Sequence, residues 1–156
     1  MVSPNSLGLG VPKGFTLAEL LVVMAILAVV AATSTPWLIT YWRSATLRAA
    51  AEELAAGLNR GRQLAISQNK SVCVEVSGTR YRYRLTDCGG TIWTGPGTDA
   101  SGFYRLANNV TLATPPNNPV FTYLGAATGA TLTVTNPQGG ATRNVVVSVS
   151  GRVQIQ

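Results

Sequence analysis

An apolar run near the N-terminus limits what this chain can fold into. From Leu17 to Ala32 every residue except Glu19 is apolar, and the pattern continues with interruptions to Ile39. About 20 consecutive apolar residues are enough for a helix to cross the hydrocarbon core of a bilayer. The run therefore predicts a helix that needs lipid or other helices around it. A carboxylate is unexpected in such a helix, so the presence of Glu19 requires an explanation.

The helical pattern continues beyond the apolar run. Apolar residues recur there at steps of three and four, which predicts one buried helix face: Leu47, Ala51, Leu54, Leu58, Gly61 and Ala65. A single helix from Phe15 to about Asn69 would be roughly 80 Å long at 1.5 Å per residue, too long for a compact domain of this size. Pro36 is expected to kink it, because proline removes a backbone donor and crowds the preceding turn.

After Asn69 the period of the pattern changes to two. SVCVEVSG is followed by the alternating segment TRYRYRL, and Ser77–Gly78 between them predicts a turn. Clusters of Gly, Pro and Asn separate seven further expected strands: Thr91–Trp93, Phe103–Leu106, Val110–Leu112, Val120–Leu124, Thr131–Thr135, Asn144–Val149 and Val153–Ile155. The sequence therefore predicts an α+β fold, in which a long N-terminal helix packs on a C-terminal antiparallel β-sheet domain.

Basic residues outnumber acidic ones, and several of them lie on one expected strand. The chain has 12 Lys and Arg against six Asp and Glu, which gives a net charge of +6. Arg80, Arg82 and Arg84 are two residues apart and share one face of the strand, whereas the tyrosines between them face the core. Together with Arg152 they are candidates for contacts with DNA phosphates or another partner. A solvated basic face is the simpler interpretation.

The two cysteines, Cys73 and Cys88, are candidates for one disulfide. Two thiols cannot complete a zinc site in a chain without histidine, whereas in an oxidising compartment they would pair. Pairing would close a loop of about 15 residues and stabilise the fold by up to ~3 kcal/mol; two unpaired core cysteines are the alternative. The absence of histidine also excludes Ser-His and Cys-His pairs, so we expect no catalytic residue, metal or cofactor.

A removable secretory signal peptide is one alternative interpretation of the apolar run. Residues 30–32 are small and would suit cleavage before Thr33. Two features oppose this interpretation: the run carries Glu19 near its start, and the amphipathic helix continues beyond Pro36 as though the whole rod were retained.

Cleavage at a different position would explain Glu19. A charge at the membrane centre costs about 2.5–3.5 kcal/mol on insertion scales, so an intramembrane carboxylate is expected to have a partner. A cut between Gly14 and Phe15 would create an α-amino group four residues before Glu19. In a bundle of related helices, the Glu19 of one subunit could neutralise the amine of its neighbour. A carboxylate that reaches headgroup water at the membrane edge is the alternative.

The run KGFTLAELL, residues 13–21, closely resembles the processing site of type IV pilins and type II secretion pseudopilins. Residues 53–66, ELAAGLNRGRQLAI, and the closing Gly151-Arg152-Val153 resemble the GspH/FimT family of minor pilins and pseudopilins. The resemblance implies that a prepilin peptidase cuts after Gly14 and methylates Phe15, and that Glu19 assists filament assembly.

The resemblance also implies an organisation in four parts. Residues 1–14 would be the leader peptide, 15–39 the transmembrane and assembly half of the helix, 40–69 the amphipathic half, and 70–156 the β-rich exported domain. The chain would cross the bacterial inner membrane once, with its C-terminal domain in the periplasm or on a cell-surface filament.

The function implied by the resemblance is that of a structural subunit, not an enzyme. The chain would assemble with other pilins or pseudopilins into a type II secretion pseudopilus or a type IV pilus, for protein secretion or pilus biogenesis. A DNA-binding minor pilin that serves DNA uptake in natural transformation is the alternative. Such members of the family use a C-terminal Gly-Arg-x-Arg, and here Gln154 stands in the fourth position.

Overall fold

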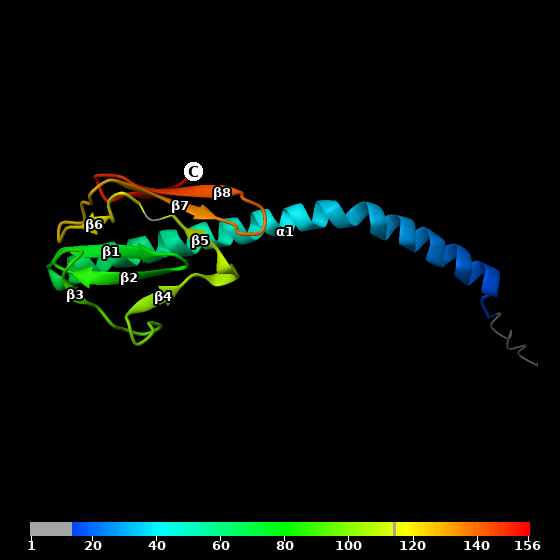
Figure 1. Ribbon diagram of the computed structural model, residues 1–156, viewed down its shortest axis with the longest axis horizontal. Coiled ribbons are helices and arrows are strands. Elements are labelled where there is room, and N and C mark those ends of the chain that lie inside the picture. Colours follow the sequence, from blue (N-terminus) through cyan, green and yellow to red (C-terminus); the bar gives the residue numbers. More distant parts are fainter. Residues whose placement is uncertain (1–13, 114) are drawn as a thin grey trace, which may run out of the picture. The chain divides into compact units, whose positions relative to one another are not determined.

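The computed structural model describes residues 14–113 and 115–156, and leaves the side chains of residues 35, 36 and 108 undescribed. It divides into two compact units, one ending at Ile39 and the other beginning at Thr40. The described elements, shown in Figure 1, are α1 (Leu17–Gln68), β1 (Val72–Ser77), β2 (Arg80–Leu85), β3 (Thr91–Ile92), β4 (Phe103–Arg105), the 3-10 helix η1 (Ala107–Asn109), β5 (Thr111–Leu112), β6 (Val120–Phe121), β7 (Ala130–Thr135), β8 (Thr142–Val147) and β9 (Val153–Ile155).

Helix α1 ends in a Schellman-type cap. Asn69 adopts a φ of 50°, the Lys70 N–H donates to the Ala65 carbonyl at 3.1 Å, and the Asn69 N–H donates to the Ile66 carbonyl at 3.2 Å. Asparagine tolerates the left-handed conformation better than most residues with a side chain. The cap therefore ends the helix and turns the chain toward β1.

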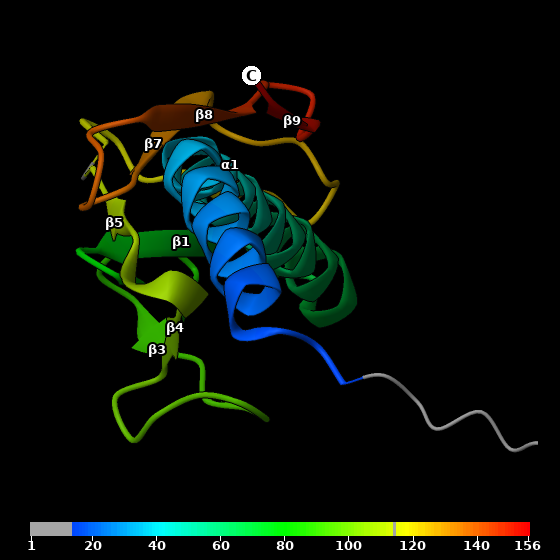
Figure 2. The same ribbon diagram turned by 90° about the vertical axis from the view of Figure 1, so that its right-hand side faces the viewer.

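The strands form two antiparallel sheets. The first, sheet A, has the order β3-β2-β1-β6, with β4 also paired to β2; the second, sheet B, has the order β5-β7-β8-β9. Figures 1 and 2 show the two sheets on two sides of the part of α1 that belongs to the second unit. The expected α+β fold is confirmed. The pattern of strands did not specify their division between two sheets, which arises because β6 returns to pair with β1 while β5 joins β7.

The helix face expected from the sequence is the face that packs in the core. Leu54, Leu58 and Ala65 are fully buried, in one cluster with the inward-facing side chains of both sheets. Each large apolar side chain buried in this way stabilises the fold by about 1.5–3 kcal/mol. The packing of this face fixes the helix from Thr40 onward in its own domain.

Two glycines bring helix and sheet A unusually close. A Cβ atom on Gly57 would lie 2.6 Å from Cζ of Tyr81, and one on Gly61 would lie 2.9 Å from Cγ2 of Val74. At this close approach, the Tyr83 hydroxyl donates a buried hydrogen bond of 2.7 Å to the Gly57 carbonyl. The alternation expected for β2 is confirmed, since Tyr81 and Tyr83 are buried and join the core.

Three expectations differ from the structure or are not tested by it. The β1–β2 hairpin pairs Ser77 with Arg80, so its turn lies at residues 78–79 and not at Ser77–Gly78; Gly78 has a φ of 60°, which glycine adopts readily. The backbone is helical at Pro36, and the kink there remains a prediction. The expected leader lies outside the described residues except for Gly14.

Candidate functional site

The first functional segment is the start of α1. The Thr16 hydroxyl accepts a hydrogen bond of 3.2 Å from the Glu19 backbone N–H, which makes Thr16 the N-cap of the helix. Thr16 and Glu19 have the spacing of a capping box, which is a local signal for the start of a helix. Phe15 is 79% exposed, and apart from its chain neighbours no atom of the described residues lies within 4 Å of the Cβ position of Gly14. Phe15 is thus exposed immediately before the helix.

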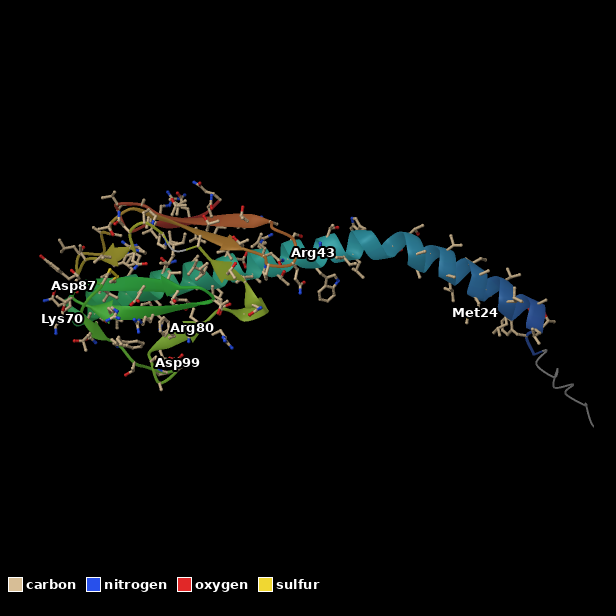
Figure 3. The ribbon with its side chains drawn as sticks, viewed as in Figure 1. Met24, Arg43, Lys70, Arg80, Asp87 and Asp99 are labelled. Carbon is tan, nitrogen blue, oxygen red and sulfur yellow. A yellow bond between two sulfur atoms is a disulfide. The ribbon has the colours of Figure 1, made fainter. Side chains whose placement is uncertain are left out.

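The segment that follows is apolar on all sides. Residues Leu17–Ser34 have a mean hydropathy of 2.4, and no part of this window is buried within the chain. A helix that is apolar all round is stable only when lipid or other helices surround it. Figure 3 shows side chains of this segment, Met24 among them, projecting around the helix. The helix is long and apolar enough to cross a membrane.

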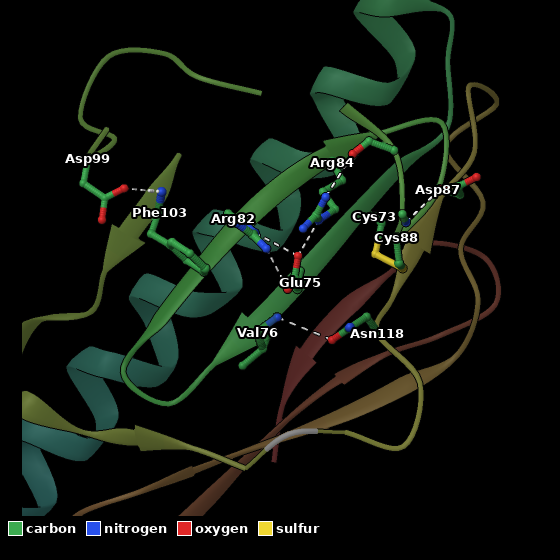
Figure 4. Close-up of polar contacts among 12 residues, drawn as sticks. Cys73, Glu75, Val76, Arg82, Arg84, Asp87, Cys88, Asp99, Phe103 and Asn118 are labelled. Atoms are coloured by element: carbon green, nitrogen blue, oxygen red, sulfur yellow. Dashed lines mark hydrogen bonds and ion pairs between the residues drawn. A yellow bond between two sulfur atoms is a disulfide. The ribbon is translucent and has the colours of Figure 1, made fainter. Parts of the chain in front are cut away.

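The second feature is an ionic cluster on the outer face of sheet A. Glu75 of β1 accepts two hydrogen bonds from Arg82, at 2.8 and 3.0 Å, and a third from Arg84. The three side chains are only 25%, 14% and 19% exposed, in that order. Figure 4 shows both guanidinium groups converging on the carboxylate. We call Glu75, Arg82 and Arg84 the β1–β2 ionic cluster.

The cluster keeps the Glu75 carboxylate ionised and contacts side chains of the neighbouring strand β4. The hydrogen bond from Arg82 lowers the pKa of Glu75 below its ordinary value, against the opposing effect of partial burial, and Arg84 adds to the lowering. The Arg82 guanidinium also lies over the ring of Phe103, 4.4 Å from its centroid. Arg80 lies over the same ring and 3.8 Å from a carboxylate oxygen of Asp99. The cluster therefore joins three strands of sheet A.

The cysteines form a disulfide next to this cluster. Cys73 of β1 is bonded to Cys88 in the loop after β2, and Cys73 is fully buried. Arg84 lies opposite Cys73 in the β1–β2 ladder and donates a hydrogen bond of 3.0 Å to the Gly90 carbonyl. Disulfide and arginine together hold the loop after β2 against the outer face of sheet A.

The four arginines proposed as DNA contacts are not assembled into one site. Arg80, Arg82 and Arg84 share a face of β2, but Glu75 and Asp99 compensate part of their charge. Arg152 lies in the turn between β8 and β9 of the other sheet, where its backbone N–H donates to the Ser148 hydroxyl. The DNA-uptake alternative gains no support from this arrangement.

A third feature was missed because its members lie far apart in the sequence. Arg62 on α1 donates a hydrogen bond of 2.8 Å from Nε to the Gly125 carbonyl, and a Cβ atom on Gly151 would collide with the same carbonyl. Gly125 and Gly151 have φ values of 82° and 78°, which disfavour other residues. We call this the Arg62–glycine junction; it ties the end of the helix to the loops before β7 and β9.

Within the described residues, no three His, Cys, Asp or Glu side chains gather into a group that could hold a metal. The expectation of no catalytic residue, metal or cofactor stays a prediction.

Comparison with known proteins shows which family the chain belongs to. The family model described as "Type II transport protein GspH" matches residues 50–151, which is 102 of the 156 residues, and a prokaryotic N-terminal methylation motif matches residues 12–35. No curated protein matches the chain significantly.

Solved structures with the same fold include minor pilins and pseudopilins. The minor pilin FimU of Pseudomonas aeruginosa is 24% identical, with 70% of this chain and 92% of that chain covered at a TM-score of 0.51. The minor pseudopilin EpsH of Vibrio cholerae is 13% identical, with 70% and 95% covered at 0.53. GspH of E. coli is 16% identical, with 72% and 88% covered at 0.51. At these identities the likeness shows the fold.

Proposed function

Because this chain belongs to the GspH family of type II transport proteins and is a structural subunit of a type II secretion pseudopilus or a type IV pilus, we propose that α1 acts first as its membrane anchor and then as its assembly segment. The observation that carries this proposal is the unburied apolar window Leu17–Ser34. Lipid would cover that window before assembly, and neighbouring helices would cover it in the filament.

The same proposal includes processing at the Gly14–Phe15 bond. A prepilin peptidase would remove residues 1–14 and methylate the new amine of Phe15. Three observations support it: the methylation motif spans this bond, Phe15 is exposed, and the helix cap at Thr16 lies on the retained side of the cut. The mature chain would therefore keep an intact helix start.

Glu19 is proposed to neutralise the N-terminal amine of a neighbouring subunit. A charge surrounded by apolar helices is strongly unfavourable unless an opposite charge pairs with it. Glu19 is exposed on the surface of the helix, so its carboxylate can reach a neighbouring subunit and register one helix against the next.

The second unit, from Thr40 onward, is proposed to be the exported domain, outside the inner membrane in the periplasm or on the filament. Its disulfide supports this location, because disulfides persist in oxidising compartments. No catalytic role is proposed for it; its surface would contact other subunits.

A pair of matched substitutions tests the proposal. Glu19→Gln keeps the shape of the side chain and removes its charge, and the control Glu52→Gln removes an exposed carboxylate whose side chain is 55% accessible and is paired with Arg48. Losing one partner of a buried ion pair costs about 3–5 kcal/mol, so incorporation of the Glu19 variant into sheared filaments should fall more than about a hundredfold. Normal incorporation of this variant would contradict the role of Glu19.

A further inference from the structure

The exported domain carries an apolar surface patch that its own core does not explain. Among the described residues from 43 onward, five large apolar side chains are exposed. One of them, Ile92, lies apart from the others on β3. The other four are Ile66, Tyr123, Leu124 and Val149, with exposed fractions of 50%, 50%, 77% and 73%. We call these four the distal apolar patch. Single exposed apolar residues need no explanation, but a group of them marks an interaction surface.

Backbone contacts hold Ile66, Leu124 and Val149 of the patch in a fixed arrangement, and Tyr123 directly precedes Leu124 in the chain. Leu124 directly precedes Gly125, and the Cβ position of Gly125 lies 3.3 Å from Cδ1 of Ile66 at the end of α1. The carbonyl of Val149 accepts a hydrogen bond of 3.0 Å from the Ala127 N–H. The Arg62–glycine junction thus gathers side chains from the helix and two loops before any partner binds, which lowers the ordering cost of association.

The patch lies at the end of the exported domain that is opposite to the entry of the helix. The helix enters this domain at Thr40 and ends at Gln68, so the patch is about 40 Å along the helix from the entry, at 1.5 Å per residue. Figure 3 shows Lys70 at the same end of the domain and Arg43 at the other. Within this domain, the patch is therefore far from the residues at which the helix enters.

The net positive charge of this domain restricts which subunit can bind the patch. From Thr40 onward the chain has 11 basic and five acidic residues. Lys70 and Arg152 are exposed at the distal end of the domain together with one carboxylate, Asp87, and Arg43 and Arg143 are exposed at the entry end. A head-to-tail contact between two copies of this chain would bring two ends with an excess of cations together, and like charges across an interface are unfavourable. The cations near the patch instead suit a partner with carboxylates around its apolar surface.

We propose that the distal apolar patch docks onto a different pilin-type subunit, one that offers an apolar recess with an acidic rim. This inference rests on the proposed function, because it names the partner of a subunit already taken to be part of a filament. Leu124 is the central anchor, since it is the most exposed member of the patch. Arg152 supplies the charge that selects an acidic partner over a second copy.

Site-specific photocrosslinking tests the partner. The full-length protein is made in its own cells with benzoylphenylalanine in place of Leu124, and with the same probe in place of Ile92 as the matched exposed control. We expect a crosslink from position 124 and at most a severalfold weaker one from position 92. Mass spectrometry should identify the partner as another pilin-type chain with a net negative exported domain. Crosslinks only to a second copy, to a secreted protein or to DNA, or equal yields at both positions, would overturn the inference.

A second variant separates this inference from the proposed function. Leu124→Asp changes an exposed side chain, so the domain should fold and the chain should still be cut before Phe15, whereas its incorporation into filaments should fall about tenfold. Ile92→Asp should be incorporated normally. Normal incorporation of Leu124→Asp would overturn the docking inference and leave the proposed function intact. Failure of the unaltered chain to be processed or incorporated would overturn the proposed function itself.

Discussion

Replacing Glu75 by Gln tests how the outer face of sheet A is held together. The substitution removes the carboxylate on which Arg82 and Arg84 converge, and leaves two guanidinium groups that are 14% and 19% exposed without their anion. Removing one partner from a fully buried ion pair costs about 3–5 kcal/mol, whereas an exposed pair is worth about 0–1. Because Glu75 is 25% exposed, we expect the free energy of unfolding at neutral pH to fall by about 2 kcal/mol.

The effect should depend on pH in a defined direction. Hydrogen bonding from Arg82, more than any other contact, lowers the pKa of Glu75 below its ordinary value of 4.5. A carboxyl group whose pKa is lowered in the folded state contributes stability that is complete above its unfolded pKa and is lost as the pH falls through its folded pKa. The difference between the native chain and Glu75→Gln should therefore be largest above pH 4.5 and shrink below it.

Urea denaturation of the full chain in mild detergent, followed by near-ultraviolet circular dichroism, measures this difference. Glu52→Gln is the matched control, because Glu52 and Arg48 form an i,i+4 pair with side chains 55% and 69% exposed. We expect the control to lose at most about 0.5 kcal/mol. Equal losses for the two variants at neutral pH, or a Glu75→Gln difference that persists unchanged in acid, would refute the reasoning.

Two further perturbations address the disulfide and the helix–sheet contact. Replacing both Cys73 and Cys88 by Ser should lower the free energy of unfolding by about 3 kcal/mol, and dithiothreitol should destabilise the native chain but not this variant in the same urea titration. Tyr83→Phe should lower it by about 1 kcal/mol, because the buried donor to the Gly57 carbonyl is lost, whereas Tyr104→Phe, whose hydroxyl bond is exposed, should have a much smaller effect. Equal losses for the two tyrosine variants would contradict the importance of the Tyr83 contact.

The helix and its buried face could be predicted because they depend on local pattern. Apolar residues at steps of three and four mark the side of α1 that packs in the core, and the predicted limits, Phe15 to about Asn69, differ by at most two residues from Leu17–Gln68. Alternation likewise placed Tyr81 and Tyr83 inside. The buried helix face and the buried tyrosines could both be predicted because each depends only on the spacing of residues within one helix or one strand.

The ionic cluster could not be predicted because a hairpin's register depends on the position of its turn. With the turn at Ser77–Gly78, as expected from the sequence, Glu75 would lie opposite Arg80. In the structure the turn is one residue later, and Glu75 lies opposite Arg82. A shift of one residue in the turn thus changes the cross-strand partner of every residue by two positions. The sequence therefore did not identify which arginine pairs with Glu75.

The Arg62–glycine junction illustrates a second limit. Arg62 and Gly125 are 63 residues apart, and no periodicity within either segment indicates that they meet. Glycines that adopt positive φ at a close approach are visible in the sequence only as glycines. Contacts of this kind depend on how the two sheets close around α1, which the strand pattern did not specify.

The mature N-terminus of the protein, determined by mass spectrometry on material purified from its own cells, tests the central claim most directly. We expect a chain that begins at an N-methylated Phe15, four residues before Glu19, with the whole of α1 retained. A chain that begins near Thr33 would identify the apolar run as a removed signal peptide and would contradict the membrane anchor, the role of Glu19 and assembly through α1.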